Sequence, residues 1–406
     1  MDGTVTATVN GNTVTISRQG DGNTVSAGSE ISFTVDKITN QKFAGASGNF
    51  PAFKTTEQDG TAIDVAAGGT LPSSVTFTPS YFGGNAPVVT GHSLVAGAVG
   101  AWELQFETGN PLPADGKIII EFPAEFHTVA ANAATAVDNS IDGSLTASTS
   151  TRTVTIVRSG GGASEIAAGA TVKISIPSIT NQKFEGDSAA WVAVKTTLAD
   201  GSIIDDASVS GGTLPSSVTF VPSLFNGNAP VVSPFSRVAG DRTDLNISFT
   251  TQNPIPADGK IIFEVPASFC DCQASSVLGL SGIDGNFAVS QTGTSTAYSS
   301  TLKQSGGPWV VTLARNGDGS IVSAGATVSF TVSEVINQQH IGPSGIYPLF
   351  KTTLSDGTTA IDESSPESDS TGTEPLSVDF VAGSFLELSA RPDFLVSGLN
   401  STFHFR

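Results

Sequence analysis

The sequence predicts an all-β chain built from tandem antiparallel β-sandwich repeats. The first observation is a long internal repeat, because residues 111–126 (PLPADGKIIIEFPAEF) return 143 positions later as residues 254–269 (PIPADGKIIFEVPASF). The second is the alternation of apolar and polar residues in short runs, which places every second side chain on one face of a strand. The third is the Asp-Gly and Gly-rich turns between those runs, since glycine accepts positive φ without steric cost.

The composition favours a protein that works outside the cell. Only 14% of the 406 residues are charged, and 18 Lys and Arg stand against 37 Asp and Glu, a formal net charge of -19. This charge repels phosphate backbones and anionic lipid, so nucleic acid is excluded as a partner. No run reaches the roughly 20 apolar residues of a membrane helix, which predicts no membrane insertion. Abundant Ser and Thr with few Lys favour an extracellular or cell-surface location.

The repeat divides the chain into four predicted segments, of which the first two are 1–84 and 85–227. Residues 1–84 match only the later part of a repeat, so they should form a partial sandwich that lacks its early strands. Within this segment Ile31, Phe33 and Val35 should line one face of a strand. Residues 85–227 should form a complete sandwich of about eight strands, separated by turns at the usual intervals.

The last two predicted segments are residues 228–389 and 390–406. The first of these is a second complete repeat, lengthened between Cys270 and Pro308 and in the acidic loop 362–373. Surface loops on a fixed scaffold tolerate such insertions. Residues 390–406 should provide the first strand of a further repeat, because LNSTFHF keeps the phase of LNISFTT in the preceding copy.

The sequence contains no convergent set of catalytic residues. The four histidines do not recur at one position of the repeat, and no nucleophile-elbow, phosphate-loop or zinc-protease motif is present. We therefore predict no enzymatic activity, no cofactor and no metal site. Each repeat carries acids around an Asp-Gly pair, which we interpret as hairpin-turn residues, with a shared Ca²⁺ as the alternative. These acids are Asp59 and Asp64, then Asp200, Asp205 and Asp206, then Asp356 and Asp362.

Two groups of side chains are candidates for covalent cross-links. Cys270 and Cys272 lie at i and i+2, so a strained local disulfide, a link to a neighbouring chain and two free thiols all remain open. A lysine also recurs in each KTT segment, 14 positions after an asparagine, which suggests a Lys–Asn isopeptide bond. Edge lysines that prevent strand pairing explain the same pattern. The residues are Lys54, Lys195 and Lys351 with Asn40, Asn181 and Asn337.

Two asparagines are candidate N-glycosylation acceptors. Asn246 stands in Asn-Ile-Ser and Asn400 in Asn-Ser-Thr. Both occupy the outward phase of the same repeat strand, where the first complete repeat has Glu103. If the protein is secreted by a eukaryote, we predict covalently attached glycans at these positions.

Three patterns recur along the chain and carry a resemblance to a known class of repeat. They are PxPADGKIxxEFPxxF, SAGxxVxFTVxxITN and KTTxxDGxxID. The repeat is similar to the tandem immunoglobulin-like β-sandwich repeats of very large surface and extracellular-matrix proteins of algae, other protists and bacteria. The resemblance covers essentially the whole chain and implies an Ig-like fold in an extracellular array, such as part of a flagellar hair or surface glycofibril. The lengthened third copy and the Cys pair depart from the regular pattern.

We predict a structural repeat protein of an extracellular filament or surface fibre. Equivalent residues at regular intervals suit a rod better than a catalyst. The alternative is a cell-surface adhesin or carbohydrate-binding module that uses the loop between Cys270 and Pro308, with Tyr298 and Trp309.

Self-association is the predicted mode of assembly, and it involves the C-terminal strand. This strand should carry Leu399, Phe403 and Phe405 on its inward face. Either it enters the incomplete N-terminal repeat of the next subunit, giving a head-to-tail filament, or it belongs to the covalent continuation of a longer array.

Overall fold

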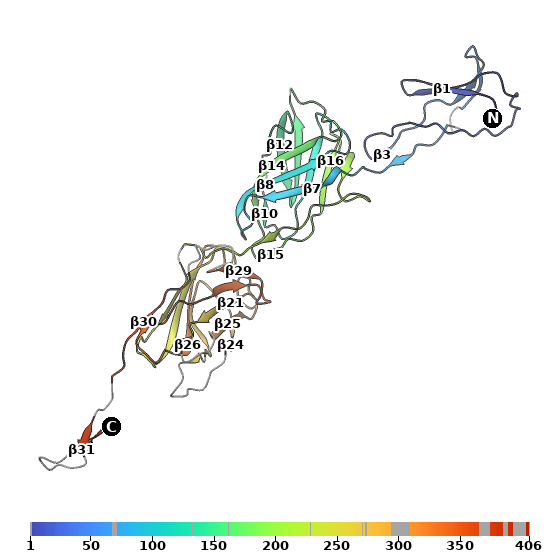
Figure 1. Ribbon diagram of the computed structural model, residues 1–406. Coiled ribbons are helices and arrows are strands. Elements are labelled where there is room, and N and C mark those ends of the chain that lie inside the picture. The colour runs from blue at the N-terminus through green and yellow to red at the C-terminus, as the bar shows by residue number, and fades with distance from the viewer. Residues whose placement is uncertain are drawn as a thin grey trace. The chain divides into compact units, whose positions relative to one another are not determined.

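The computed structural model describes residues 2–66, 71–130, 133–160, 162–227, 229–269, 271–272, 274–293, 309–364, 374–384, 389–392 and 403–405. The chain divides into two compact units, Met1–Lys42 and Phe43–Arg406. All regular structure in these residues is β-strand (Figure 1). No helix in the described ranges is long and apolar enough to span a membrane.

The first complete repeat is a sandwich of two five-stranded sheets. The strands of one sheet are β7 (Gly83–Gly91), β8 (Val99–Glu107), β10 (Thr128–Val129), β11 (Thr135–Ala136) and β14 (Thr171–Thr180). Those of the other are β9 (Lys117–Glu121), β12 (Ser144–Ser150), β13 (Thr153–Ser159), β16 (Ala193–Thr197) and β17 (Ile203–Asp206). Their orders are β10-β14-β8-β7, with β11 also on β14, and β12-β13-β9-β16-β17.

The second complete repeat has the same topology, strand for strand. One sheet contains β19 (Val231–Pro234), β20 (Arg242–Thr250), β22 (Asp271–Cys272), β23 (Val277–Ser281) and β26 (Thr327–Ile336). The other contains β21 (Lys260–Val265), β24 (Phe287–Thr292), β25 (Trp309–Arg315), β28 (Phe350–Thr353) and β29 (Ala360–Glu363). Every pairing in both sandwiches is antiparallel. The prediction of an all-β chain with tandem antiparallel sandwiches is therefore confirmed.

The period-2 pattern of the sequence decides which side chains enter each core. Along β8, Trp102, Leu104 and Phe106 are buried, while Glu103 and Gln105 between them are exposed. Trp102 is the centre of an aromatic cluster, with ring centroids 5.2 Å from Phe126, 6.1 Å from Phe220 and 6.2 Å from Trp191. Aromatic rings bury large apolar areas and gain further from tilted and edge contacts.

The repeated Asp-Gly turn before β9 and β21 requires glycine for space. A Cβ on Gly116 would lie 2.5 Å from Leu112 Cδ1, and one on Gly259 would lie 2.9 Å from Ile255 Cγ2. Leu112 and Ile255 are themselves completely buried. The turn is therefore packed directly onto the core, which fixes where the central strand of each sheet begins.

The described part of residues 1–84 forms isolated hairpins and short bridges. The hairpins are β1 (Val5–Asn10) with β2 (Thr13–Arg18), and β4 (Lys54–Thr56) with β5 (Ala62–Val65), and β3 (Gly45–Ala46) pairs with β6 (Thr76–Phe77). In the complete repeat, β13 and β16 both pair with β9. Residues 1–84 contain no counterpart of β9 to join the equivalent strands.

The predicted strand through Ile31, Phe33 and Val35 is wrong. These residues form no strand, and the side chains of Ile31 and Phe33 are 41% and 47% exposed. Their counterpart in the complete repeat, β14, pairs with β8 along its length. Because residues 1–84 hold no counterpart of β8, the segment has neither a ladder partner nor an opposing sheet to bury its apolar face.

Short strands also occur near the C-terminus. Here β31 (Ala390–Pro392) pairs with β32 (Phe403–Phe405), so that Pro392 faces Phe403. Phe403 and Phe405 of the predicted assembly strand lie in β32, and Leu399 lies outside the described residues. The segment thus provides two paired strands where the sequence predicted one.

Candidate functional site: the junction between repeats

The linker between the two complete sandwiches pairs with both of them. Val221 donates its N–H to Leu94 O at 2.9 Å and accepts from Ala96 N at 2.8 Å, both in the preceding sandwich. Two positions later, Ser223 donates to Ile361 O at 3.3 Å and accepts from Glu363 N at 2.8 Å, both in β29 of the following sandwich. The linker backbone is therefore hydrogen-bonded to both sandwiches, at Val221 to the preceding one and at Ser223 to the following one.

The same path recurs where residues of the incomplete repeat enter the first sandwich. Ser80 N donates to Ile204 O at 3.1 Å, and Asp206 N donates to Ser80 O at 2.8 Å. Each linker then places a phenylalanine in the core of the following sandwich. The ring centroids of Phe82 and Phe106 are 4.9 Å apart, and the equivalent Phe225 belongs to the core of the second sandwich.

A buried carboxylate organises the junction between the complete sandwiches. Asp362 is 0% exposed and accepts from Gln252 N at 2.9 Å, Asn253 N at 3.1 Å, Asn253 Nδ2 at 3.1 Å and Ser223 Oγ at 2.6 Å. Asn253 Nδ2 also lies 3.3 Å from Ala96 O in the preceding sandwich. One carboxylate thus holds together a strand, a loop and the linker.

Asp205 is the equivalent carboxylate of the first sandwich, also 0% exposed. It accepts from Gly109 N at 3.0 Å and from Asn110 N and Nδ2 at 3.1 Å each. Here the linker hydroxyl does not reach the carboxylate, because Ser80 Oγ donates to Tyr81 O at 3.3 Å. The carboxylate and its loop are therefore a feature of the repeat, and the serine contact is an addition at the second junction.

Burial dominates the electrostatics of both carboxylates. It raises the pKa of Asp362 to about 6, against the opposing effect of the hydrogen bonds from Ser223, Asn253 and Gln252. Burial likewise raises the pKa of Asp205 above its ordinary value. Neither carboxylate takes part in any ion pair among the described residues. Backbone and amide dipoles replace a basic side chain as the neutralising environment.

The repeated acids of the Asp-Gly segments have two separate roles. The earlier acid caps the turn: Asp200 Oδ1 accepts from Ser202 N at 2.8 Å, and Asp356 Oδ1 accepts from Thr358 N at 2.9 Å. The later acid, Asp205 or Asp362, is buried at the junction. No group of three or more His, Cys, Asp and Glu able to hold a metal ion occurs within the described part of the chain.

A second contact crosses each junction from the NQKF loop. Glu185 N donates to Ala360 O at 2.8 Å, and Glu185 Oε1 accepts from Ala360 N at 2.7 Å. Its counterpart Ala44 donates to Ile203 O at 2.7 Å. In the last repeat the equivalent residue, Ile341, is 64% exposed. The loop is therefore a docking element wherever a complete sandwich follows it.

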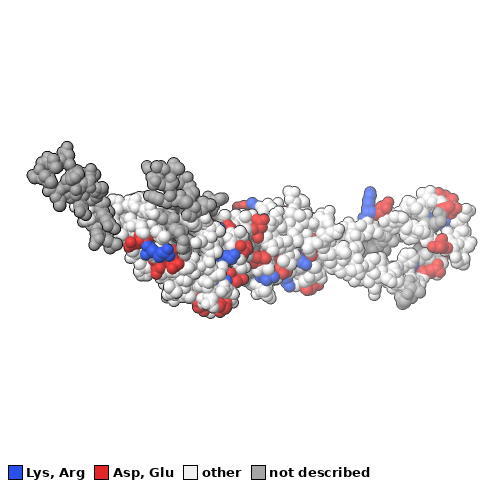
Figure 2. Space-filling model, turned by 90° about the horizontal axis from the view of Figure 1, so that it is seen from below, with Lys and Arg blue, Asp and Glu red and all other residues white. Residues whose placement is uncertain are grey.

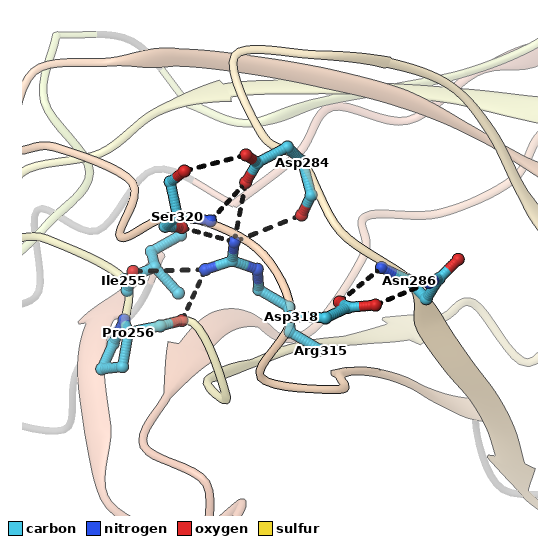
Figure 3. A network of polar contacts seen from close by, with 7 residues as sticks. All are labelled: Ile255, Pro256, Asp284, Asn286, Arg315, Asp318 and Ser320. Atoms are coloured by element: carbon cyan, nitrogen blue, oxygen red, sulfur yellow. Dashed lines mark hydrogen bonds and ion pairs between the residues drawn. The ribbon is translucent and has the colours of Figure 1, made fainter.

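A buried arginine fastens several loops in each sandwich, and Figure 3 shows the one in the second, Arg315. Arg315 Nη1 donates to Pro256 O at 2.6 Å, and Nη2 donates to Ser320 O at 2.6 Å and contacts Asp284 Oδ1 at 3.3 Å. Arg158 makes the same set of contacts in the first sandwich. The planar guanidinium presents N–H groups in a fixed fork to several carbonyls, a geometry that the single ammonium nitrogen of lysine does not reproduce.

The N-terminal copy of this arginine lacks half of its partners. Arg18 Nη2 reaches Asn23 O at 2.7 Å and Asp2 Oδ1 at 3.3 Å, and its side chain is 32% exposed. The carbonyls that would match Pro113 or Pro256 belong to the PADG segment, which residues 1–84 do not contain. Sequence analysis did not single out this arginine, although its recurrence just before each Gly-rich turn was visible.

The hypothesis of an isopeptide bond is wrong for the first complete repeat. Asn181 Nδ2 donates to Ser93 O and Val95 O at 2.9 Å each. Asn337 Nδ2 makes the equivalent two bonds in the second sandwich. Lys195 Nζ instead pairs with Asp206 Oδ2 at 3.1 Å. The asparagines hold the loop that receives the linker, so their recurrence has a structural cause.

The remaining candidate residues are only partly placed. Asn246 is exposed on β20, as Glu103 is on β8. Cys272 lies in β22, where its backbone pairs with Val335. Outside the described residues lie Asn400, Cys270, the side chain of Cys272, and residues 294–308 of the long loop. Trp309 is buried in the core of the second sandwich, so its predicted part in the adhesin alternative is wrong. Glycosylation, the cysteine pairing and the rest of the adhesin alternative remain predictions.

Comparison with known proteins adds little to this geometry. No family model and no curated protein matches the chain. A solved structure, the type II cohesin dyad from the adaptor ScaA scaffoldin of Acetivibrio cellulolyticus, covers 67% of this chain and 88% of its own, with 8% identity and a TM-score of 0.20. At that score the similarity carries no argument about function. The repeated junction is the feature on which function must be argued.

Proposed function

We propose that this chain is a structural repeat protein, a segment of a tandem array in an extracellular filament or surface fibre. The observation that carries the proposal is the repeated junction, in which Asp205 and Asp362 occupy the same buried position. A spacer has to fix each repeat to its neighbour, and both junctions use the strand edge of one domain to bind the linker of another. Nearest-neighbour coupling of this kind is the basis of stability in repeat arrays.

The junction resists separation of the two sandwiches because their groups share one network. Parting them would break the contact of Asn253 Nδ2 with Ala96 O, or release the linker from the backbone bonds of Val221 on one side or of Ser223 on the other. Hydrogen bonds to a charged group contribute about 1.5–3 kcal/mol each. A linker that is hydrogen-bonded to both sandwiches restricts the movement of one repeat against the next.

The surface chemistry fits a molecule exposed to water and to glycan attachment. On the face shown in Figure 2, charged side chains are scattered and most of the described surface is uncharged. Asn246 on the outer face of β20 is accessible to a glycosyltransferase. We assign no catalytic role and no cofactor to the chain, and its main partner is a further copy of the repeat.

Assembly by continuation of the array is favoured over strand donation. In the complete repeat, Val231 of β19 faces Ser248 of β20. In the C-terminal hairpin, Pro392 faces Phe403, which is the same register one step further along the equivalent strands. The hairpin that contains Phe403 and Phe405 thus resembles the start of another sandwich.

Immunogold electron microscopy of intact source cells tests the proposal. Antibodies raised against the full chain should label a surface filament at regular intervals without permeabilising the cells. Preimmune serum is the control. Label that appears only after permeabilisation would contradict an extracellular array. Binding of the full chain to a glycan array, without filament labelling, would instead favour an adhesin.

A further inference from the structure

A buried cluster at the second junction brings a hydroxyl, a carboxylate and an amide into mutual contact. Ser223 Oγ donates to Asp362 Oδ1 at 2.6 Å. Asn253 Nδ2 donates to Ser223 Oγ at 2.8 Å and to Asp362 Oδ1 at 3.1 Å. Ser223 and Asn253 are each 3% exposed, and Asp362 is 0% exposed. A nucleophile, a base and an amide carbonyl group therefore meet where water is largely excluded.

The Asp362 carboxylate is placed to act as a general base toward Ser223. It already accepts the hydroxyl proton, at a distance that general-base catalysis requires. Backbone N–H groups of Gln252 at 2.9 Å and Asn253 at 3.1 Å hold the carboxylate in this orientation. Burial raises the pKa of Asp362, which makes its carboxylate a stronger base than that of an exposed aspartate.

The Asn253 side chain is held in place by the preceding sandwich. Its Nδ2 donates to Ala96 O at 3.3 Å. A Cβ on Gly97 would lie 1.9 Å from Asn253 Oδ1, so the amide occupies space that only glycine leaves open. An amide fixed beside a hydroxyl reacts as if the two groups were highly concentrated. Pro254 follows Asn253 and has no N–H, so the usual attack of the next backbone nitrogen on the asparagine side chain is closed here.

We propose that Ser223 and Asn253 form an intramolecular ester with release of ammonia. As Ser223 Oγ bonds to Asn253 Cγ, the hydroxyl proton passes to Asp362. The bond between Cγ and Nδ2 then breaks, and the departing nitrogen takes that proton and leaves as ammonia. The carboxylate is regenerated, and no oxidant, reductant or further reactant is needed. Because the reaction occurs once in each chain, slow chemistry is sufficient.

The ester would fasten the linker covalently to the second sandwich. Ser223 belongs to the linker, and Asn253 belongs to the loop before β21. Escape of ammonia into solvent opposes the reverse reaction, and burial of the cluster protects the product from hydrolysis. The linker would then keep its place even when its backbone hydrogen bonds open. This modification does not depend on the proposed filament function, and its test is separate from the test of that function.

The first junction has the same three residue types without the same contacts. Ser80 Oγ donates to Tyr81 O at 3.3 Å rather than to the carboxylate of Asp205. Asn110 is only half-buried, whereas the equivalent Asn253 is buried. We therefore expect one ester in each chain, at the second junction.

Mass spectrometry of the full chain, produced in a bacterial host that attaches no N-glycan, tests the ester. The intact mass should fall below that calculated from the sequence by about 17 Da, the mass of the ammonia displaced by the nucleophile. Trypsin should release residues 196–237 and 243–260 as one linked peptide. Mild base should separate the two peptides, because it hydrolyses an ester and leaves an amide cross-link intact.

Three variants isolate the reacting groups. Ser223→Ala removes the nucleophile and Asp362→Asn removes the base, so both should have the mass of their sequences, with the two peptides separate. Ser80→Ala is the matched control, because it makes the same substitution at the first junction and should keep the linked peptide. Circular dichroism should show unchanged strand content in all three variants.

The unmodified chain alone can overturn the proposal, whatever the variants do. A mass that still matches the sequence after prolonged incubation at neutral pH would exclude the ester. A mass loss without the linked peptide would also exclude it, because it would indicate a succinimide elsewhere, as at Asn226 before Gly227. A linked peptide that persists in the Asp362→Asn variant would refute the role of the carboxylate as the base.

Discussion

The Ser223 hydroxyl donates to Asp362 Oδ1 at 2.6 Å, which fixes the linker to a strand 139 positions later in the chain. The contact is buried, and the same carboxylate accepts the backbone N–H of Asn253. A single acidic residue in β29 therefore determines how the chain leaves one sandwich and enters the next. The first two predictions below follow from this network.

Replacing Asp362 by alanine should destabilise the second sandwich by about 2–4 kcal/mol, because buried donors at Gln252, Asn253 and Ser223 would lose their acceptor. Urea denaturation with intrinsic fluorescence measures the change. Asp379→Ala is the control, since Asp379 is exposed on β30 (Asp379–Phe380) and should change stability by less than about 0.5 kcal/mol. Equal effects of the two variants would contradict the assigned role.

Acidification from pH 7 to pH 5 should increase the contribution of Asp362 to stability. Its folded pKa of about 6 is above the value of 3.8 for the free side chain, so the folded state binds a proton more readily than the unfolded state. The free-energy cost of burying the ionised carboxylate is present above pH 6. It is relieved as the pH falls between the folded and the free pKa, which increases the free energy of unfolding by at most about 3 kcal/mol.

The Asp362→Asn variant isolates this site from all other titrating groups. The difference in unfolding free energy between the unmodified protein and the variant should grow in favour of the unmodified protein as the pH falls. Asp356 has the opposite sign, because hydrogen bonds from Thr359 and Thr358 lower its pKa, so its stabilisation is lost in strong acid. A difference that shrinks between pH 7 and pH 5 would mean that Asp362 stabilises the junction as the anion.

Arg315→Lys should cost about 2–3 kcal/mol, since one ammonium nitrogen does not reproduce the two guanidinium nitrogens that separately reach Pro256 O and Ser320 O. Arg18→Lys is a natural control in the same chain. Arg18 is partly exposed and has no PADG carbonyls to lose. Thermal unfolding by calorimetry should therefore show a clear loss for Arg315 and almost none for Arg18. The reverse order would refute the role given to the buried guanidinium.

Asn246→Gln should remove one N-glycan from the chain when it is produced in a eukaryotic secretory system. Asn246 is exposed on the outer face of β20, where the sequon is accessible. Intact mass before and after peptide N-glycosidase treatment gives the number of glycans. Asn400→Gln tests the second acceptor in the same way. Identical masses for the unmodified protein and the Asn246 variant would show that the site is not used.

The fold was predictable because its determinants are local. The alternation around Trp102 specifies an inward face, and the PADG turn marks where β9 and β21 begin. Both signals depend on residues adjacent in sequence, and the 143-residue repeat shows them twice. Ile31 and Phe33 show the limit of local alternation as a signal. They have the alternating pattern of a strand, but the segment forms no strand and their side chains are exposed.

The junction was not predictable, since its parts are distant in sequence. Asp205 and Asp362 were visible as recurring acids, but an Asp near an Asp-Gly pair is more simply read as a turn residue. Only the tertiary structure shows that Asn110 or Asn253 covers the carboxylate. Their position directly before the Pro-rich segment recurs in both copies, which is the signal that could have identified them.

The way the linker is bound makes each repeat an interchangeable unit. Among the described residues, the contacts between adjoining repeats come from a serine linker, an NQKF-type loop, and an Asp–Asn pair that receives the linker. The insertions between Cys270 and Pro308 fall outside these elements. Recombination within the linker could therefore add, remove or exchange whole repeats, and the length of the protein could change during evolution without redesign of any contact between adjoining copies.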